Sequence, residues 1–505
     1  MEAIKIGTRR EVCWDEALMD QAEGIRVQMH KPEFRNIVME CDKPWEGNTC
    51  GYFCIVEDDG YYRMYYRGSA YTVNEEARRN KDHRVMYCYA ESQDGKTFTR
   101  VPVDIMSYWG TKDNNIIRDD IADNMYVFKD TNPNCPPEER YKGLAEYDPE
   151  RPGYDGARNL YLFTSADGVH FKPNRLLADD GNYDSMNVAF WDKTTKQYFL
   201  FYRAIVGAHT ENGKVSDGYN NTLTPEEYRH CLNMIRTIRV RTSKDFVHWG
   251  EPKYLDFGPD ANVMELYTNQ VQQYYRANHM FIGFPMRYID RYKDAESYPH
   301  LPDWKFRQRL IRNCGRGGTV MTDGLIMTSR DGYHFRRTEE AFMTAGPERG
   351  TNWYYGDGGG AYGMVETASD IPGEPNEISI YYGWDYRTKA VKLARYAVRL
   401  DGFFSWHCDY KPGKVITKPI VFDGGELHIN FATSAVGYVQ IRLLDKEGQA
   451  IEGFDSGKLF GNSVDREVAF KGDLSELAEK EIRLEISMSD ADLYSFKFEP
   501  LPTLI

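Results

Sequence analysis

Four copies of one short pattern organise this chain of 505 residues. Each copy reads Ser-x-Asp-(Gly)-x-x-(Phe or Trp), and the copies begin at Ser92, Ser165, Ser243 and Ser329. The pattern is typical of a hairpin turn, in which the aspartate accepts backbone N–H bonds, glycine adopts a positive φ and the aromatic residue anchors the returning strand. Because one reaction needs one site and the pattern occurs four times, we interpret these aspartates as turn residues rather than catalytic groups.

A second repeating feature precedes the turns: an apolar segment followed by a segment rich in Tyr and Phe. In the fifth unit, Arg399-Leu-Asp-Gly-Phe-Phe404 replaces the turn pattern. Five units of about 75 residues, each reading as an antiparallel four-stranded sheet, predict an all-β chain with a five-bladed β-propeller. The paired segments are 51–68, 124–147, 187–204, 268–288 and 361–386, and the fifth unit ends with 391–406.

The repeat ends near residue 411, and the strand-like segments after it alternate without it. We therefore predict an N-terminal extension over 1–30, with a short helix within residues 12–24. The propeller follows over 31–411, and a β-sandwich over 412–505. The short junction between the last two parts predicts that the sandwich packs against the propeller.

The charge balance excludes some classes of partner. The chain has 63 Lys and Arg against 77 Asp and Glu, which gives a formal net charge of −14. This acidity argues against nucleic acid and against an anionic membrane surface. No segment approaches the ~20 apolar residues of a membrane span, so we expect no membrane partner. A homo-oligomer remains compatible with the composition.

Nine cysteines are spread along the chain without a recurring CxxC pair or another metal-ligand spacing. We interpret them as buried free thiols. The N-terminal segment is charged throughout and has no apolar signal region. We therefore expect a cytoplasmic chain in a reducing compartment, with no metal and no cofactor.

The topology of a propeller predicts where a site would lie. The segments before the first strands, the ends of the second strands and the loops to the third strands meet at one mouth. Three long loops (69–84, 204–232 and 288–320) fall on the same mouth, and long loops often carry function. The candidate binding residues at these positions are Trp45, Asn48, Arg67, Tyr183, Asn187, Arg203, Tyr267, Asn269, Arg287, Trp353, Asp357 and Trp384.

Such a ring of carboxylates, arginines, amides and aromatic residues suits the recognition of polyols. It also offers the pair of carboxyls that glycosidic cleavage needs: a protonated one for the leaving oxygen, and a base or nucleophile. Like charge and partial burial would separate their pKa values. Each carboxylate taken alone has a simpler interpretation as a loop cap or a structural ion pair. The candidate catalytic residues are Glu46, Asp120, Asp123, Asp184 and Glu265.

With these features the chain resembles the five-bladed propeller glycoside hydrolases of families 32, 43, 62 and 68. It is most similar in architecture to family 32, which also carries a C-terminal β-sandwich. The segment Trp45-Glu46-Gly47-Asn48 stands where that family has W-M-N-D-P-N-G, and Arg118-Asp119-Asp120 resembles its R-D-P motif. The E-C motif of that family has no counterpart here, which leaves the acid and the fructan specificity open. The four turns also resemble the Asp-boxes of sialidases, but those enzymes have six blades.

The resemblance implies a nucleophile or base in the first blade, an aspartate that stabilises the transition state in the second, and an acid in the third. Carried over by position, the first role falls to Glu46 and the second to Asp120 or Asp123. The acid is Asp184, with Glu265 as the alternative.

We therefore expect a glycoside hydrolase whose catalytic domain is the propeller and whose partner is a carbohydrate substrate. Small oligosaccharides or glycosides, furanosides among them, are the expected substrates. A non-catalytic glycan-binding propeller is the alternative from another class, and it would lack two carboxyls within the ~5–10 Å that hydrolysis requires. A glycoside phosphorylase is the third hypothesis, with Arg67, Arg203 and Arg287 as its anion pocket.

Overall fold

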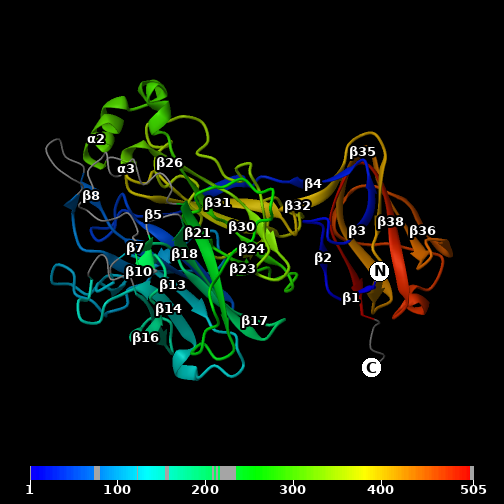
Figure 1. Cartoon of the computed structure of the whole chain (residues 1–505), viewed down its shortest axis with the longest axis horizontal. Helices are drawn as coiled ribbons and strands as arrows, with labels where there is room; N and C mark the ends of the chain where they lie inside the picture. Colours follow the sequence, from blue (N-terminus) through cyan, green and yellow to red (C-terminus); the bar gives the residue numbers. More distant parts are fainter. Residues whose placement is uncertain are drawn as a thin grey trace.

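The chain folds into a five-bladed propeller and a second β domain that lies beside it (Figure 1). The computed structural model describes residues 2–72, 80–121, 123–153, 159–206, 210–211, 214–215, 235–314 and 316–500. The predictions of an all-β fold and of a five-bladed propeller are confirmed.

Blades 1 to 4 are antiparallel sheets whose neighbouring strands follow one another along the chain. Blade 1 contains β6 (Gly51–Asp58), β7 (Tyr61–Gly68), β10 (Met86–Ser92) and β11 (Thr99–Arg100), with β12 (Ile116–Arg118) paired to β10. Blade 2 contains β13 (Met125–Lys129), β14 (Tyr141–Glu146), β15 (Leu160–Ser165) and β16 (Lys172–Ala178). Blade 3 contains β17 (Val188–Asp192), β18 (Gln197–Val206), β21 (Ile235–Ser243) and β22 (Lys253–Tyr254). Blade 4 contains β23 (Gln272–Gln273), β24 (Phe281–Gly283), β27 (Met327–Ser329) and β28 (Arg336–Arg337).

The four sequence patterns form the turns between the third and fourth strands of these blades, as predicted. In blade 2, the Ser165 hydroxyl accepts the Gly168 N–H at 3.0 Å, and Asp167 Oδ1 accepts the Val169 N–H at 2.9 Å. Gly168 has a φ of 77°, which a residue with a Cβ rarely adopts. The other three copies repeat these bonds, so the aspartates of the pattern have a structural role.

Blade 5 is closed by a strand from the N-terminal part of the chain. It contains β29 (Val365–Thr367), β30 (Glu377–Trp384), β31 (Lys392–Arg399) and, on its outer side, β5 (Glu33–Glu40). The expectation that the segment after Arg399 completes this blade is wrong, because β32 (Phe404–Cys408) pairs with β4 (Ile25–Met29) in the second domain. Pairing β5 with β31 instead ties the last blade to the start of the ring and covers a sheet edge.

The second domain is built on one eleven-stranded sheet that takes strands from both ends of the chain. The predicted helix within 12–24 is wrong: the predicted N-terminal extension supplies strands instead. Ile6, in a strand, and Leu18, in a turn, join the apolar core of this domain. The long strands β35 and β38 pair along both of their halves and contribute most of that core. The strands are β1 (Ile4–Gly7), β2 (Glu11–Val12), β3 (Met19–Glu23), β4, β32, β33 (Gly413–Thr417), β34 (Ile420–Phe422), β35 (Glu426–Asp445), β36 (Ala450–Leu459), β37 (Asn462–Glu467) and β38 (Glu481–Glu499).

The two domains are in contact through a buried core and a buried carboxylate. Trp14 is fully buried, and its ring lies 4.6 Å from that of Tyr274 in blade 4. Its indole N–H donates to the Asp401 carbonyl at 2.8 Å. The Asp401 side chain accepts hydrogen bonds from Tyr274 at 2.6 Å and from Ser495 at 2.7 Å. These contacts agree with the packing that the short junction predicted.

A helical insertion stands between β25 (Met286–Asp290) and β26 (Val320–Gly324), at one end of the propeller (Figure 1). Arg307 of this insertion donates to the backbone carbonyls of Asn352 and Trp353 in blade 5. Parts of the predicted loops 69–84 and 204–232 lie outside the described residues. The remaining elements are η2 (Tyr292–His300), α2 (Trp304–Cys314) and α3 (Arg316–Thr319) in the insertion, η1 (Pro137–Glu139), η3 (Leu474–Leu477), and the pairs β8 (Tyr71–Thr72) with β9 (Asn80–Lys81) and β19 (Thr210–Glu211) with β20 (Lys214–Val215).

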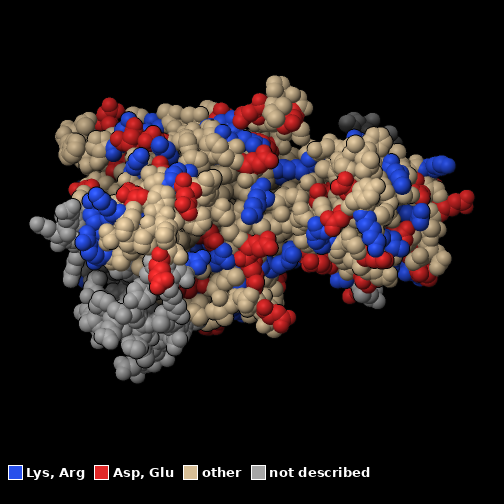
Figure 2. All heavy atoms as spheres, turned by 90° about the horizontal axis from the view of Figure 1, so that it is seen from above, with Lys and Arg blue, Asp and Glu red and all other residues tan. Residues whose placement is uncertain are grey.

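Seven cysteines among the described residues are buried free thiols, as the sequence suggested. Positive and negative side chains are interspersed over the described part of the face in Figure 2. Within the described ranges, no helix combines the length and the apolar character needed to cross a membrane.

Candidate functional site

Two carboxyl groups meet where the first strands of neighbouring blades begin. Asp123 precedes β13 of blade 2, and Asp184 precedes β17 of blade 3. Their side chains are hydrogen bonded to each other. Asp123 keeps 16 % of its side-chain surface exposed and Asp184 keeps 39 %. Both were predicted at the mouth, and this contact brings them together there.

Two buried arginines hold this pair from the second strands of blades 1 and 3. Arg67 of β7 forms an ion pair with Asp123 and also donates to the Thr49 carbonyl at 2.8 Å. Arg203 of β18 lies 3.4 Å from Asp184, and its guanidinium is fixed by Asn182 and packs over the Tyr267 ring. Each arginine therefore faces one member of the pair.

The surroundings move the pKa values of the two carboxyls in opposite directions. Although part of the Asp184 side chain reaches solvent, its enclosed position in the mouth raises its pKa well above the ordinary value. The Arg203 charge opposes this rise, and the negative charge of Asp123 and the hydrogen bond to it add to the rise. Burial also opposes ionisation of Asp123, but the Arg67 charge and the hydrogen bond from Asp184 hold the pKa of Asp123 below its usual range. These opposite shifts favour an ionised Asp123 and a protonated Asp184.

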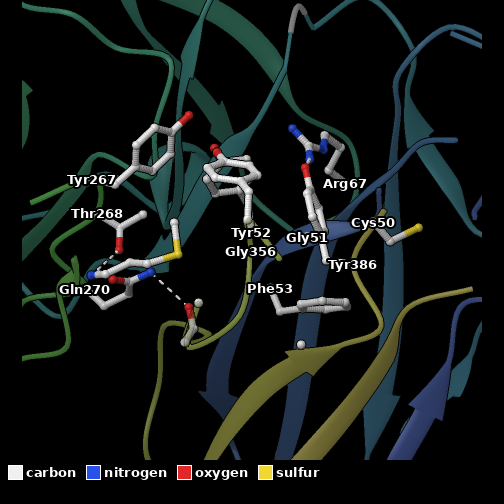
Figure 3. Close-up of a pocket in the computed structure, with 15 residues that line it drawn as sticks. Cys50, Gly51, Tyr52, Phe53, Arg67, Tyr267, Thr268, Gln270, Gly356 and Tyr386 are labelled. Carbon is white, nitrogen blue, oxygen red and sulfur yellow. Dashed lines mark hydrogen bonds between the residues drawn. The ribbon is translucent and has the colours of Figure 1, made fainter. Parts of the chain in front are cut away.

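An open hollow lies between blades 1, 4 and 5 and is lined by Arg67, the arginine that pairs with Asp123; its ≈ 550 Å³ includes space open to solvent. Figure 3 shows Arg67 and Tyr386 on one side and Gln270 and Tyr267 on the other, with the ring of Tyr52 between them. Burial raises the pKa of the Tyr52 phenol, and the negative charges of Asp123 and Asp184 raise it further. Tyr52, which lines the hollow, therefore lies close enough to feel the charges of the pair. The lining residues are Cys50, Gly51, Tyr52, Phe53, Arg67, Tyr267, Thr268, Gln270, Met286, Tyr355, Gly356, Gly359, Gly360, Gly383 and Tyr386.

Aromatic rings form one wall of this hollow and continue beyond it. Tyr267 stacks on Tyr288 with 5.7 Å between ring centres, and Tyr355 meets both rings edge-on. Arg236, at the start of β21, lies over the Tyr288 ring at 4.3 Å and forms an ion pair with Glu265. Flat apolar faces that end in hydroxyls suit a sugar ring, which also has apolar and polar surfaces.

Three predicted carboxylates lie in separate ion pairs. Glu46 has a fully buried side chain that accepts from Arg100 at 2.6 and 2.8 Å and from Tyr66 at 2.5 Å, so it has no exposed oxygen for a ligand. Asp120 forms a two-point contact with Arg118, at 2.9 and 2.5 Å. Glu265 pairs with Arg236 beside the tyrosine wall. Asp123 and Asp184 are therefore the predicted carboxylates that the structure brings into contact with each other.

Several predicted binding residues shape the loops of the mouth rather than its open surface. Arg287 donates to Asp323 at 2.9 and 2.5 Å. Asn187 and Asn269 are buried, and each bonds the backbone of its own loop. Asn48 bonds the backbone of Tyr71 in both directions.

The predicted aromatic residues other than Tyr267 also have internal partners. Tyr183 is buried against Tyr202 and Asp180. Trp45 donates to Asn115 at 2.8 Å, and Trp353 donates to the Gly346 carbonyl at 3.0 Å. Trp384 stacks on Phe34, with 5.1 Å between ring centres.

Asp357 is a buried carboxyl in the loop that leads to the glycines of the hollow. It accepts the Tyr354 N–H at 3.0 Å, and burial raises its pKa to about 6 despite this bond and the nearby Arg349 and Arg307. Because the folded state holds this proton more tightly than the unfolded chain, Asp357 contributes stability below about pH 4 and loses that contribution as the pH rises to about 6.

We expect Asp357→Asn to remove this pH dependence. The stability of the variant relative to the wild type should rise by about 2 kcal/mol between pH 4 and pH 7, since one pKa unit corresponds to about 1.4 kcal/mol and the unfolded carboxyl is already partly ionised at pH 4. Urea unfolding of both proteins across this range measures the difference. A constant difference at every pH would contradict the raised pKa.

Sequence reasoning missed four residues of the site: Tyr52, Gln270, Tyr386 and Glu146. Glu146 ends β14, is buried, and its charge contributes to the raised pKa of Asp184. A signal was available for Glu146, because it ends a second strand as Arg67 and Arg203 do. The run Gly356-Asp-Gly-Gly-Gly360 was a second signal, since glycines leave room for a ligand to approach the backbone.

One cluster of possible metal ligands lies in the second domain, far along the chain from the mouth. His428, Asp465 and Glu499 bring their ligand atoms within 4.8 Å of one another. Lys497 pairs with Glu499 and lies 3.9 Å from Asp465, so an ammonium group already supplies the positive charge there.

No protein-family model matches the chain, and no curated protein matches it. Solved structures whose chain trace resembles this one have low sequence identity to it. One concerns the GH130 family of mannoside phosphorylases and its glycoside hydrolases that target β-1,2 mannosidic linkages in Candida mannan; it is 13 % identical, with a TM-score of 0.39, and covers 72 % of this chain and 94 % of its own.

Two further structures cover similar shares. The catalytic domain of a GH62 α-L-arabinofuranosidase from Coprinopsis cinerea is 10 % identical, with a TM-score of 0.40, over 73 % of this chain and 97 % of its own. An N-acetylgalactosamine deacetylase from F. plautii, in complex with blood group B trisaccharide, is 11 % identical, with a TM-score of 0.41, over 75 % and 97 %. The function of this chain is therefore argued from its own site.

Proposed function

We propose that the chain is a glycoside hydrolase in which Asp184 is the proton donor and Asp123 is the ionised partner carboxylate. The observation that carries this proposal is the hydrogen-bonded pair, whose pKa values move apart beside a tyrosine-lined hollow. A protonated carboxyl beside an ionised one supports acid-assisted cleavage of a glycosidic bond. Because the two groups are in direct contact, closer than the ~5–10 Å of carboxyls that flank a scissile bond, Asp123 acts here through its charge and not as a nucleophile.

In this proposal the glycosidic oxygen approaches Asp184, and the scissile sugar occupies the hollow. Asp184 gives its proton to the leaving oxygen as the bond to the anomeric carbon breaks. Asp123, held ionised by Arg67, stabilises the positive charge that develops on the sugar ring, and its charge keeps the proton on Asp184 before the reaction. Water then adds to the anomeric carbon and gives a proton to the Asp184 carboxylate, which restores the acid for the next turnover.

The charges around the hollow favour hydrolysis over phosphorolysis. Arg67 pairs with Asp123, Arg203 faces Asp184, and Arg236 pairs with Glu265. The third arginine of the phosphorylase hypothesis, Arg287, is bound on two sides by Asp323. A phosphate ion would compete with these carboxylates, whereas a neutral sugar and a water molecule would not.

The test is a cleavage assay on a panel of oligosaccharides and aryl glycosides of pyranose and furanose sugars. We expect free reducing sugar, measured by chromatography, at a rate that inorganic phosphate does not change. Release of a sugar phosphate would show that the enzyme is a phosphorylase and not a hydrolase. If sugars bind but product release is no higher than in the Asp123→Asn, Asp184→Asn double variant, the chain is a glycan-binding propeller and not an enzyme.

A further inference from the structure

We propose that Gln270 is a specificity-determining residue of the hollow, whose side-chain carbonyl accepts a hydrogen bond from one hydroxyl of a neutral sugar. This inference rests on the proposed function, because it places the sugar that reacts in the hollow beside Asp123 and Asp184. It names a residue and a class of ligand that the carboxyl pair alone does not define.

The first observation is an acceptor atom without a partner. Gln270 is 2 % exposed and lines the hollow, and its Oε1 has no hydrogen-bond partner among the described residues. A buried polar atom left without a partner is destabilising, and most such atoms in proteins are satisfied. A ligand hydroxyl would satisfy this one.

The second observation is that this carbonyl is fixed in place. The amide N–H of Gln270 donates to the Gly360 carbonyl at 2.9 Å, which determines which end of the amide faces the ligand (Figure 3). The backbone on its N-terminal side is also held: the Thr268 hydroxyl accepts the Met286 N–H at 3.1 Å, and the Asn269 carbonyl accepts the Phe284 N–H at 3.0 Å. A fixed acceptor discriminates between ligands better than a mobile one.

The third observation is backbone strain at the same residue. Gln270 has a φ of 38°, in the left-handed region that side chains with a Cβ rarely adopt. Such strain persists where the surrounding structure enforces it, and it is concentrated at ligand sites. Here the residue with the strained backbone is one that lines the hollow.

The opposite wall supplies a matching donor. The Nε of Arg67 is buried and has no hydrogen-bond partner among the described residues, although the other nitrogens of this guanidinium are bonded. The hollow therefore offers an acceptor on one wall and a donor on the other. No carboxylate of a described residue lines it, and Asp123 balances the charge of Arg67, so a neutral polyol fits better than an ionic ligand.

The experiment measures sugar binding separately from cleavage. Calorimetric titrations of the Asp184→Asn protein use a panel of neutral monosaccharides, and of the monodeoxy analogues of the sugar that binds best. We expect Gln270→Met to weaken binding of that sugar by ~10–100-fold, because a hydrogen bond of a buried site is lost. One monodeoxy analogue should bind to both proteins with equal affinity, which identifies the hydroxyl.

Two further variants separate a specific contact from general damage. Gln272→Met removes another buried amide, two residues away, which does not line the hollow, and it should leave binding unchanged. Gln270→Glu should restore binding at low pH, where the protonated acid can donate to Gly360 and still accept from the sugar, and lose binding as the pH rises.

Should Gln270→Met fail to fold, Gly51→Ala replaces it as the test of the hollow. A Cβ at this position would lie 3.8 Å from Arg67 and 3.9 Å from Tyr386, which the fold accommodates but a sugar in the hollow would meet. Unchanged binding in Gln270→Met, or in Gly51→Ala where that variant stands in, overturns the inference, and so does a panel in which no sugar binds. If Gln270→Met weakens sugar binding but the wild type cleaves no glycoside, the inference is supported and the proposed function is rejected.

Discussion

Asp184→Asn is expected to lower the turnover of an unactivated glycoside by ~10²–10⁴-fold, the range of a general acid. The amide cannot give a proton to the leaving oxygen, while its size and its position beside Arg203 are retained. A dinitrophenyl glycoside, whose leaving group needs no proton, should lose much less activity. The wild type should lose activity at high pH as Asp184 gives up its proton, because the reaction needs the acid form whose pKa burial and Asp123 raise. That alkaline limb should be absent from the variant.

Steady-state rates of both substrates across the pH range test this prediction. Asp179→Asn is the matched control, since Asp179 is exposed and lies five residues earlier in the same loop. Equal losses on the activated and unactivated substrates would show that Asp184 does not act as the acid.

Asp123→Asn is expected to cause a loss of the same order on both kinds of substrate, because the partner carboxylate is needed whatever the leaving group. The variant should also shift the alkaline limb to lower pH. Removal of the Asp123 charge removes one cause of the raised pKa of Asp184, so the acid gives up its proton earlier.

Asp120→Asn provides the control for this variant. Asp120 is three residues earlier and is paired with Arg118, so its rate and its pH profile should stay close to those of the wild type. If Asp120→Asn lost as much activity as Asp123→Asn, the pair would not be the reacting centre. An unmoved alkaline limb in Asp123→Asn would separate Asp184 from its proposed partner.

The blades could be predicted from the sequence because their signal is local. The turn that begins at Ser165 places its serine, aspartate, glycine and aromatic residue within seven positions, so one hairpin can be identified without the rest of the fold. The closure of blade 5 could not be predicted, because β5 and β31 are separated by most of the chain. Neither segment has a sequence pattern that indicates which strand it pairs with. The N-terminal strands of the second domain were missed for the same reason.

The site could be predicted only in part, and the limit is physical. Topology indicated that Asp123 and Asp184 lie at strand starts around one axis, but Glu46 occupies an equivalent position and is fully enclosed by Arg100 and Tyr66. Whether a side chain at such a position faces the hollow depends on contacts from other strands. The same holds for Gln270, whose unpaired carbonyl becomes visible only when all its neighbours are placed.

The strand β5, which closes the last blade, has a consequence for synthesis on the ribosome. The first blade strand to emerge can pair only after β31 has emerged, more than three hundred residues later, so an unpaired edge persists during most of translation. The strands β1 to β4 remain without their sheet partners still longer, because that sheet includes β33, β34 and β38. The propeller has all its strands once β31 is made, whereas the sheet of the second domain still lacks β32 to β38 at that point. The second domain can therefore complete its sheet only after the whole propeller has been synthesised.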